Sequence, residues 1–161
     1  MKTVPPRSSR GGVREIGWAE FGGLAVELAD RIAAAYEPDV VLGIANAGVF
    51  VGGALAPALR AELVHLHLPG RGVETERLPS LAGKRVLVVD DAADSGATLA
   101  RATALAKKAR AAEIRTAVIV LRPGGARPDF HALQTADVTI FGWDYQFHSG
   151  SPDGDPGDAG V

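Results

Sequence analysis

The chain has 161 residues, a mass of 16.6 kDa and 47% hydrophobic residues, which is enough for one sizeable core and excludes wholesale disorder. Its 17 Lys and Arg nearly balance 19 Asp and Glu, for a formal net charge of -2, and this argues against a protein that coats nucleic acid. The absence of cysteine excludes disulfides, thiolate nucleophiles and cysteine-ligated zinc, and the composition is compatible with a cytoplasmic protein.

The first third of the chain predicts an arm, a helix and a strand. Residues 1–12 contain no apolar core, so we expect a flexible arm rather than a secretory signal. Residues 18–36 predict an amphipathic helix, because Leu or Ile recurs at every fourth position from Leu24 to Ile32. The apolar run 39–44 predicts a buried strand. Residues 40–59 carry no charge, but glycines and an asparagine interrupt them where a loop would fall, so no membrane span is expected.

The middle of the chain predicts a helix and two strands around a long loop. Residues 49–61 predict a helix, although two adjacent glycines lower its helix propensity. The alternating pattern of residues 62–68 predicts a strand. Residues 69–84 are polar and hold two prolines and three glycines, which is typical of a loop that acts as a lid. Residues 85–90 predict the next buried strand.

The last third repeats the pattern and ends in a polar tail. Residues 97–112 predict a helix, 116–121 a strand, 122–128 a turn-rich segment and 137–141 a final strand. Residues 149–161 consist mainly of Gly, Asp, Pro and Ser, and we expect a disordered tail there.

Strands that alternate with helices predict one α/β domain over residues 13–148, with a mostly parallel sheet flanked by helices. Ligands of such folds bind beyond the carboxyl ends of the strands. Three segments at that edge, 45–48, 90–98 and 122–128, are therefore the candidate binding loops.

The segment after the strand 85–90 predicts an anion site beside an acidic pair. The first amides of the helix that follows have no internal partner, and Gly96 permits a tight turn. Ser95 and Thr98 add hydroxyl donors. The carboxylates of Asp90 and Asp91 only accept hydrogen bonds, so they suit sugar hydroxyls or a divalent cation. Together these features predict a ribose 5-phosphate site.

Two other interpretations of these acids stay open. They could be ordinary strand-end and helix-capping residues. Paired acids after a strand also bind magnesium in receiver domains of response regulators. In those domains the pair follows the first strand and a later strand ends in a phosphoacceptor Asp, whereas here two strands precede the pair and the strand 116–121 ends before Arg122.

The 13 residues VLVVDDAADSGAT, 86–98, resemble the PRPP-binding motif of type I phosphoribosyltransferases, where PRPP is 5-phosphoribosyl 1-pyrophosphate. The resemblance extends from about Trp18 to Phe147. Residues 38–56, PDVVLGIANAGVFVGGALA, resemble the family's first strand and pyrophosphate loop. LRPGGARPDF and FGWDY resemble the base-binding region of the xanthine-guanine and hypoxanthine branch.

The resemblance implies the type I phosphoribosyltransferase fold with a small hood. It also implies transfer of the phosphoribosyl group from PRPP to xanthine, guanine or hypoxanthine in purine salvage, with Mg2+ as cofactor and a homodimer or homotetramer as the assembly. Asp94 would be the catalytic residue, taking or sharing the proton at N7 of the base, and Asp91 would also lie near the metal. The implied PRPP-binding residues are Asp90, Asp91, Ala92, Ala93, Asp94, Ser95, Gly96, Ala97, Thr98, Asn46, Ala47, Gly48 and Arg71. The implied base-binding residues are Arg122, Thr139, Trp143 and Asp144.

Some features leave alternatives open. Asn46 and Ala47 stand where the pyrophosphate loop often has a basic residue and glycine, which favours a PRPP-binding regulatory or sensor protein with weak or no transfer. Arg122 could equally be an exposed strand-end arginine, and Trp143 a core residue. A transferase with a different acceptor is a further possibility.

Overall fold

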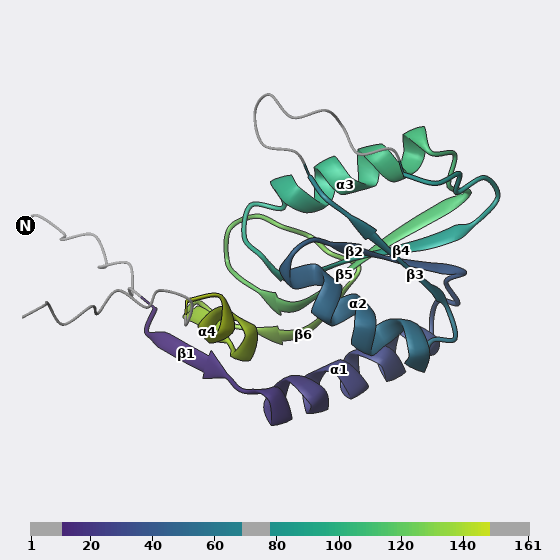
Figure 1. The fold of residues 1–161 in the computed structure, drawn as a ribbon. Coiled ribbons are helices and arrows are strands. Elements are labelled where there is room, and N and C mark those ends of the chain that lie inside the picture. Colours follow the sequence, from purple (N-terminus) through teal and green to yellow (C-terminus); the bar gives the residue numbers. More distant parts are fainter. Residues whose placement is uncertain (1–10, 69–77, 149–161) are drawn as a thin grey trace, which may run out of the picture.

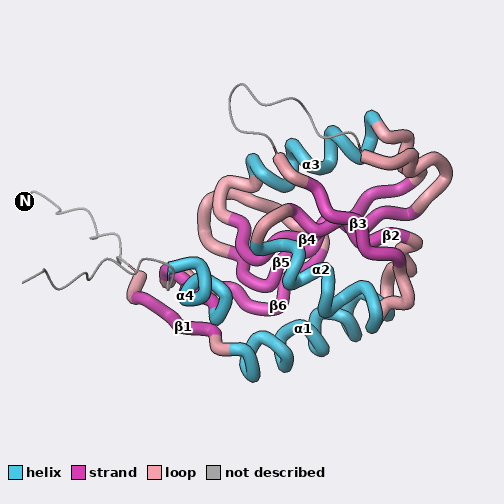
Figure 2. The backbone as a smooth tube through the Cα atoms, viewed as in Figure 1, coloured by secondary structure: helices cyan, strands magenta, loops and turns pink. Residues whose placement is uncertain are grey.

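The computed structural model describes residues 11–68 and 78–148, with side chains up to Tyr145 (Figures 1 and 2). The elements are β1 (Val13–Ile16), α1 (Trp18–Ala33), β2 (Val40–Ile44), α2 (Ala47–Ala58), β3 (Glu62–Leu66), β4 (Arg85–Ala93), α3 (Ala97–Lys108), β5 (Glu113–Leu121), β6 (Phe130–Gln134), β7 (Val138–Phe141) and α4 (Gly142–His148). Most of the predicted arm, the predicted tail and Arg71 lie outside the described residues.

The main sheet confirms the predicted parallel α/β fold. Its five strands are parallel and lie in the order β3-β2-β4-β5-β6. Helices α1 and α2 cover one face and α3 lies on the other (Figure 1). Alternate residues of β4 fill two separate cores, with Leu87 and Val89 on the α1 and α2 side and Val86 and Val88 on the α3 side. Among the described helices none is both long and apolar enough to cross a membrane.

A second, smaller sheet forms the hood. β1 and β7 pair in parallel, from Val13 opposite Val138 to Ile16 opposite Phe141. Aromatic packing fixes this sheet to the main domain: the Trp143 ring stacks on Phe141 and on Phe50 of α2, with ring centroids 4.5 and 4.9 Å apart. A two-stranded sheet is marginal on its own, so this cluster holds the hood in place.

Several sequence-based boundaries were wrong. β1, β6 and α4 were not predicted; β6 (FHALQ) contains no β-branched residue, and its pairing with β5 overrides its weak propensity. The strand predicted to end at residue 90 continues to Ala93, because Ala92 and Ala93 still pair with Val120 and Leu121. The second helix begins at Ala47 rather than residue 49, so Ala47 and Gly48 belong to a helix and not to a loop.

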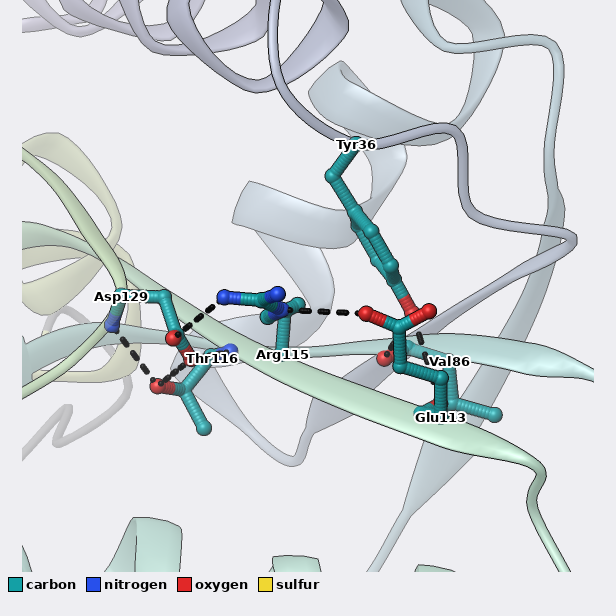
Figure 3. A network of polar contacts seen from close by, with 6 residues as sticks. All are labelled: Tyr36, Val86, Glu113, Arg115, Thr116 and Asp129. Carbon is teal, nitrogen blue, oxygen red and sulfur yellow. Dashed lines mark hydrogen bonds and ion pairs between the residues drawn. The ribbon is translucent and has the colours of Figure 1, made fainter.

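Paired polar groups join the elements at the amino end of the main sheet (Figure 3). The Tyr36 hydroxyl donates to the carbonyl oxygens of Val86 and Glu113, at 3.2 and 3.3 Å. Arg115 bonds to the carboxylates of Glu113 and Asp129, at 3.2 and 3.3 Å. Each charged group of this network lies against an opposite charge or a hydrogen-bonding partner, so the network has a structural role.

Candidate active site

The acidic pair lies at the carboxyl end of β4, half-buried between the flanking strands. The backbone N–H of Asp91 donates to Oδ1 of Asp90 at 3.0 Å, and the N–H of Ala92 donates to Oδ1 of Asp91 at 2.7 Å. Burial, followed by the negative charge of Asp91, raises the pKa of Asp90 to about 7. Burial also raises the pKa of Asp91. The described residues therefore neutralise the pair poorly, and the pair suits a ligand that brings hydrogen-bond donors or positive charge.

The predicted anion cup follows directly. After Ala93 the chain turns through Gly96, whose φ of 83° is left-handed, and α3 begins at Ala97 as predicted. The first N–H with an intrahelical acceptor is that of Ala100, so the earlier amides of α3 are free of helical bonds. These residues line a cavity of about 180 Å³ that extends from Ala92 to Leu99. Its position at a helix N-terminus favours an anion.

The start of α2 lies against the same strand end. A Cβ atom at Gly48 would lie 2.7 Å from the carbonyl oxygen of Val89 and 3.2 Å from Oδ1 of Asp90. Glycine is therefore needed for the first turn of α2 to approach the acidic pair this closely. Asn46, which precedes the helix after a cis peptide bond, is exposed at this edge. The structure thus places Gly48 beside Asp90, at the sheet edge that the sequence predicts for this segment.

Arg122 and Asp94 also meet at this edge. Nη1 of Arg122 lies 4.0 Å from Oδ2 of Asp94, and the N–H of Arg122 donates to the carbonyl of Ala93 at 2.8 Å. The N–H of Ala126 donates to the carbonyl of Asp94 at 2.9 Å, which fixes the loop after β5 to the cup. Nε of Arg122 is buried with no acceptor among the described residues. Sequence reasoning named both residues but did not predict that they pair.

Helix α4, which follows β7, places Asp144 near the acidic pair and Trp143 in the core. Oδ2 of Asp144 accepts the N–H of Phe141 at 2.8 Å, which caps the start of α4. Burial raises the pKa of Asp91, and the negative charge of Asp144 adds to the rise. Trp143 is only 1% exposed and packs within the aromatic cluster. Thr139 lies in β7 opposite Arg14.

Sequence reasoning missed two contributors to this edge. Gly124 lies so close to Asp94 that a Cβ atom there would overlap the carboxylate. The sequence predicts only a turn at the adjacent glycines 124 and 125, although close backbone approach is another common reason for glycine. Phe50 stacks on Trp143, a long-range contact that no local pattern indicates.

Comparison with known proteins decides the family. The model of the phosphoribosyl transferase domain matches residues 17–149. The chain belongs to the phosphoribosyltransferase family. A purine phosphoribosyltransferase from Pyrococcus horikoshii superposes on this chain with a TM-score of 0.74 at 26% identity, over 82% of this chain and 94% of that one. The xanthine-guanine-hypoxanthine phosphoribosyltransferase of Helicobacter pylori also gives 0.74, over 85% and 97% of the two chains, but at 14% identity this likeness shows the fold alone.

Relatives by sequence act on different bases, according to their names. An orotate phosphoribosyltransferase from Sulfolobus acidocaldarius is 31% identical over 104 residues, which are 63% of this chain and 51% of that protein. An adenine phosphoribosyltransferase from Saccharopolyspora erythraea is 36% identical over 122 residues, covering 61% of this chain and 66% of that protein. The chain thus spans between half and two thirds of the length of these curated relatives.

Proposed function

We propose that this phosphoribosyltransferase transfers the 5-phosphoribosyl group of PRPP to a 6-oxopurine (xanthine, guanine or hypoxanthine) and releases pyrophosphate, as an enzyme of purine salvage. The observation that carries the proposal is the position of Asp94. It lies between the anion cup and the guanidinium of Arg122, a few residues after the acidic pair. One sheet edge thus offers groups for a phosphate, for sugar hydroxyls and for a base.

PRPP would bind along the strand end and the cup. The first amides of α3, which have no helical acceptor, suit the 5-phosphate together with the hydroxyls of Ser95 and Thr98. In the structure the Ala97 N–H donates to the Ser95 hydroxyl at 3.3 Å, a bond that the phosphate would replace. Asp90 and Asp91 would accept hydrogen bonds from the two ribose hydroxyls, and these donors favour the ionised carboxylates that burial disfavours. The first amides of α2, at residues 46–48, would face the pyrophosphate. Arg71, the proposed lid contact to pyrophosphate, lies outside the described residues.

The donor set fits Mg2+ held jointly by the protein and its substrate. Carboxylate oxygens are the ligands that this cation prefers, and Asp91 would be the contributing side chain. Among the described residues no three His, Cys, Asp or Glu side chains converge, so oxygens of PRPP would complete the coordination. When bound, the cation offsets negative charge on the departing pyrophosphate.

Asp94 and Arg122 would handle the base. As the base attacks C1 of the ribose, the bond from C1 to pyrophosphate breaks and its electron pair leaves with pyrophosphate. The proton at N7 of the base passes to, or is shared with, the Asp94 carboxylate. The Arg122 donors suit the exocyclic oxygen of a 6-oxopurine, whereas the 6-amino group of adenine is itself a donor and would meet them unfavourably.

A PRPP-binding sensor without efficient transfer is the second candidate. The segment that would face pyrophosphate, Ala45 to Val49, contains no Lys or Arg. This segment would then contact the leaving group through backbone amides without a basic side chain of its own, which favours binding over turnover. The contact between Asp94 and Arg122 supports the enzyme, because a sensor has no use for a base-binding pair.

A panel of acceptors separates these candidates. The protein is incubated with PRPP, Mg2+ and one of hypoxanthine, guanine, xanthine, adenine or orotate, and pyrophosphate release is followed. We expect the 6-oxopurines to react about 5–150-fold faster than adenine or orotate, because an unsatisfied polar contact costs about 1–3 kcal/mol. Faster reaction of adenine or orotate would contradict the proposed acceptor. PRPP binding with no base consumed would support the sensor instead.

A further inference from the structure

A second cavity lies on the outer side of the anion cup, between α3 and the loop after β5. Its volume is about 370 Å³, and its main lining residues are Leu99, Ala100, Thr103, Lys107, Arg127 and Pro128. We propose that this groove binds a nucleotide as an effector, separately from the PRPP site. The volume lies within the range of small-molecule sites.

The groove follows one face of α3. Gly96 directly precedes α3. Ala100, Thr103 and Lys107 follow it by four, seven and eleven positions, so the four residues lie along one face of the helix. Eleven residues of helix span roughly 16 Å. Arg127 and Pro128 form the facing wall. This shape accommodates an elongated ligand with distinct ends, rather than a lone inorganic ion.

The lining combines an apolar floor with two cations. Leu99, Ala100 and Pro128 offer apolar surface to a flat ring, while Lys107 and Arg127 supply positive charge from opposite walls. Among the described residues that line it there is no Asp or Glu. A planar apolar body that carries phosphate matches this pattern, and nucleotides are that class of ligand.

Within the described part of the chain, neither Lys107 nor Arg127 forms an ion pair with a carboxylate. Residues 95–112 hold four Lys and Arg and no acid. Arg127 makes its hydrogen bond to the carbonyl of Ala126, at 3.1 Å, rather than to a carboxylate. The nearby carboxylate of Asp129 is occupied by Arg115 and Thr116. Basic residues near Lys107 also suit the C-terminal end of the helix dipole, but Arg127 lies outside any helix and has no such role.

Occupancy of the groove would affect PRPP binding through Gly96. This residue lines both the groove and the 180 Å³ cup. Ala126, the neighbour of Arg127, packs against Gly96: a Cβ atom at Gly96 would lie 3.3 Å from it. The N–H of Ala126 also donates to the carbonyl oxygen of Asp94. A ligand bound between α3 and residues 127–128 would thus change the conformation of the turn at Gly96, and with it the affinity of the cup for the PRPP phosphate.

The test is a titration of AMP into the full-length protein already saturated with PRPP and Mg2+, followed by calorimetry. AMP is the probe because its 6-amino group disfavours the proposed base site beside Arg122. We expect saturable binding that weakens about tenfold or more in Lys107→Ala and in Arg127→Ala, since each removes a charge-assisted bond to phosphate. Lys108→Ala, on the same helix turn but outside the groove lining, is the matched control and should bind AMP normally.

Three results would overturn the proposal. One is strict competition between AMP and PRPP with no effect of Lys107→Ala, which places AMP in the PRPP site. Another is the absence of saturable AMP binding. The third is equal affinity for AMP and inorganic phosphate, which would show that the apolar residues of the groove do not bind the nucleoside part of AMP. None of these measurements needs a base acceptor or turnover, so failure here is distinguishable from failure of the proposed transferase activity.

Discussion

The two ends of the main sheet treat their carboxylates in opposite ways. At the amino end, a hydrogen bond from the backbone of Arg85, followed by bonds from its side chain, lowers the pKa of Asp39. At the carboxyl end, burial and then the charge of Asp91 raise the pKa of Asp90 to about 7. Asp39 lies 3.3 Å from the Arg85 guanidinium, whereas neither Asp90 nor Asp91 has an ion pair with a described residue.

The contrast separates groups that stabilise the fold from groups kept available for a ligand. An acid whose charge is favoured in the folded state adds stability, and one whose charge is disfavoured subtracts it. The amino end therefore contributes to folding, while the carboxyl end lowers stability in the absence of ligand. Functional sites commonly lower the stability of a fold, and favourable contacts elsewhere in the domain compensate for the loss.

The largest expected effect comes from Asp94→Asn. The amide keeps the size of the side chain but cannot take a proton from the base, so we expect kcat to fall by roughly 10²–10⁴-fold. The PRPP dissociation constant should change little, because the cup amides and the acidic pair are intact. Steady-state kinetics with hypoxanthine and direct PRPP titration check the two quantities. An equal loss of PRPP binding would show that Asp94 belongs to the PRPP site and not to the base step.

Asp90→Asn should weaken PRPP binding and stabilise the fold. The folded pKa of Asp90, about 7, exceeds the ordinary value of 3.8, so the folded state retains a proton that the unfolded chain has released. The free energy of unfolding of the wild type should therefore fall as pH rises from about 4 to about 7. The variant lacks this loss and should be more stable at pH 8 by roughly 1–3 kcal/mol. PRPP affinity should drop roughly 10–100-fold, because a charged acceptor is lost.

Asp39→Asn is the matched control at the amino end. Asp39 has a lowered pKa, so its contribution to stability is present above its unfolded pKa and is lost as pH falls. This variant should be less stable than the wild type at pH 7 and should bind PRPP normally. Denaturant unfolding from about pH 2 to pH 8 covers both slopes, because that of Asp39 lies below about pH 4 and that of Asp90 between about pH 4 and pH 7. If both variants destabilise the protein at pH 8, the two ends do not differ as described.

Arg122→Ala should change base preference by about tenfold. Loss of the guanidinium removes donors from the exocyclic oxygen of a 6-oxopurine, and a bond from a charged donor contributes about 1.5–3 kcal/mol. We expect kcat/KM for hypoxanthine to fall while that for adenine stays the same or rises. Arg122→Lys, which keeps the charge, should preserve the preference. An unchanged ratio in Arg122→Ala would leave this residue with a structural role at the end of β5.

Local sequence patterns predicted most of the main sheet and the composition of the cup. The cup could be predicted from residues 86–98 alone, because the strand, the acids, the turn and the start of the helix follow one another in the sequence. What could not be predicted depends on contacts between distant residues. The pairing of β1 with β7 joins residues more than 120 positions apart, and the stacking of Phe50 on Trp143 joins residues more than 90 positions apart. For the same reason, sequence reasoning could not choose between a core role and a base-pocket role for Trp143.

Tyr36→Phe should have the smallest effect and should be confined to stability. The hydroxyl bonds to the carbonyls of Val86 and Glu113 are 3.2 and 3.3 Å long, so their loss should lower the free energy of unfolding by about 1 kcal/mol. The ring should stay packed, with Arg115 still 5.9 Å from its centroid. Because burial raises the pKa of Tyr36 to about 12, the wild type should also lose stability between pH 10 and 12, and the variant should lose less. Turnover should be unchanged, since the amino end lies opposite the strand ends that carry the candidate active site. A change in kcat would show that the two ends of the sheet are coupled.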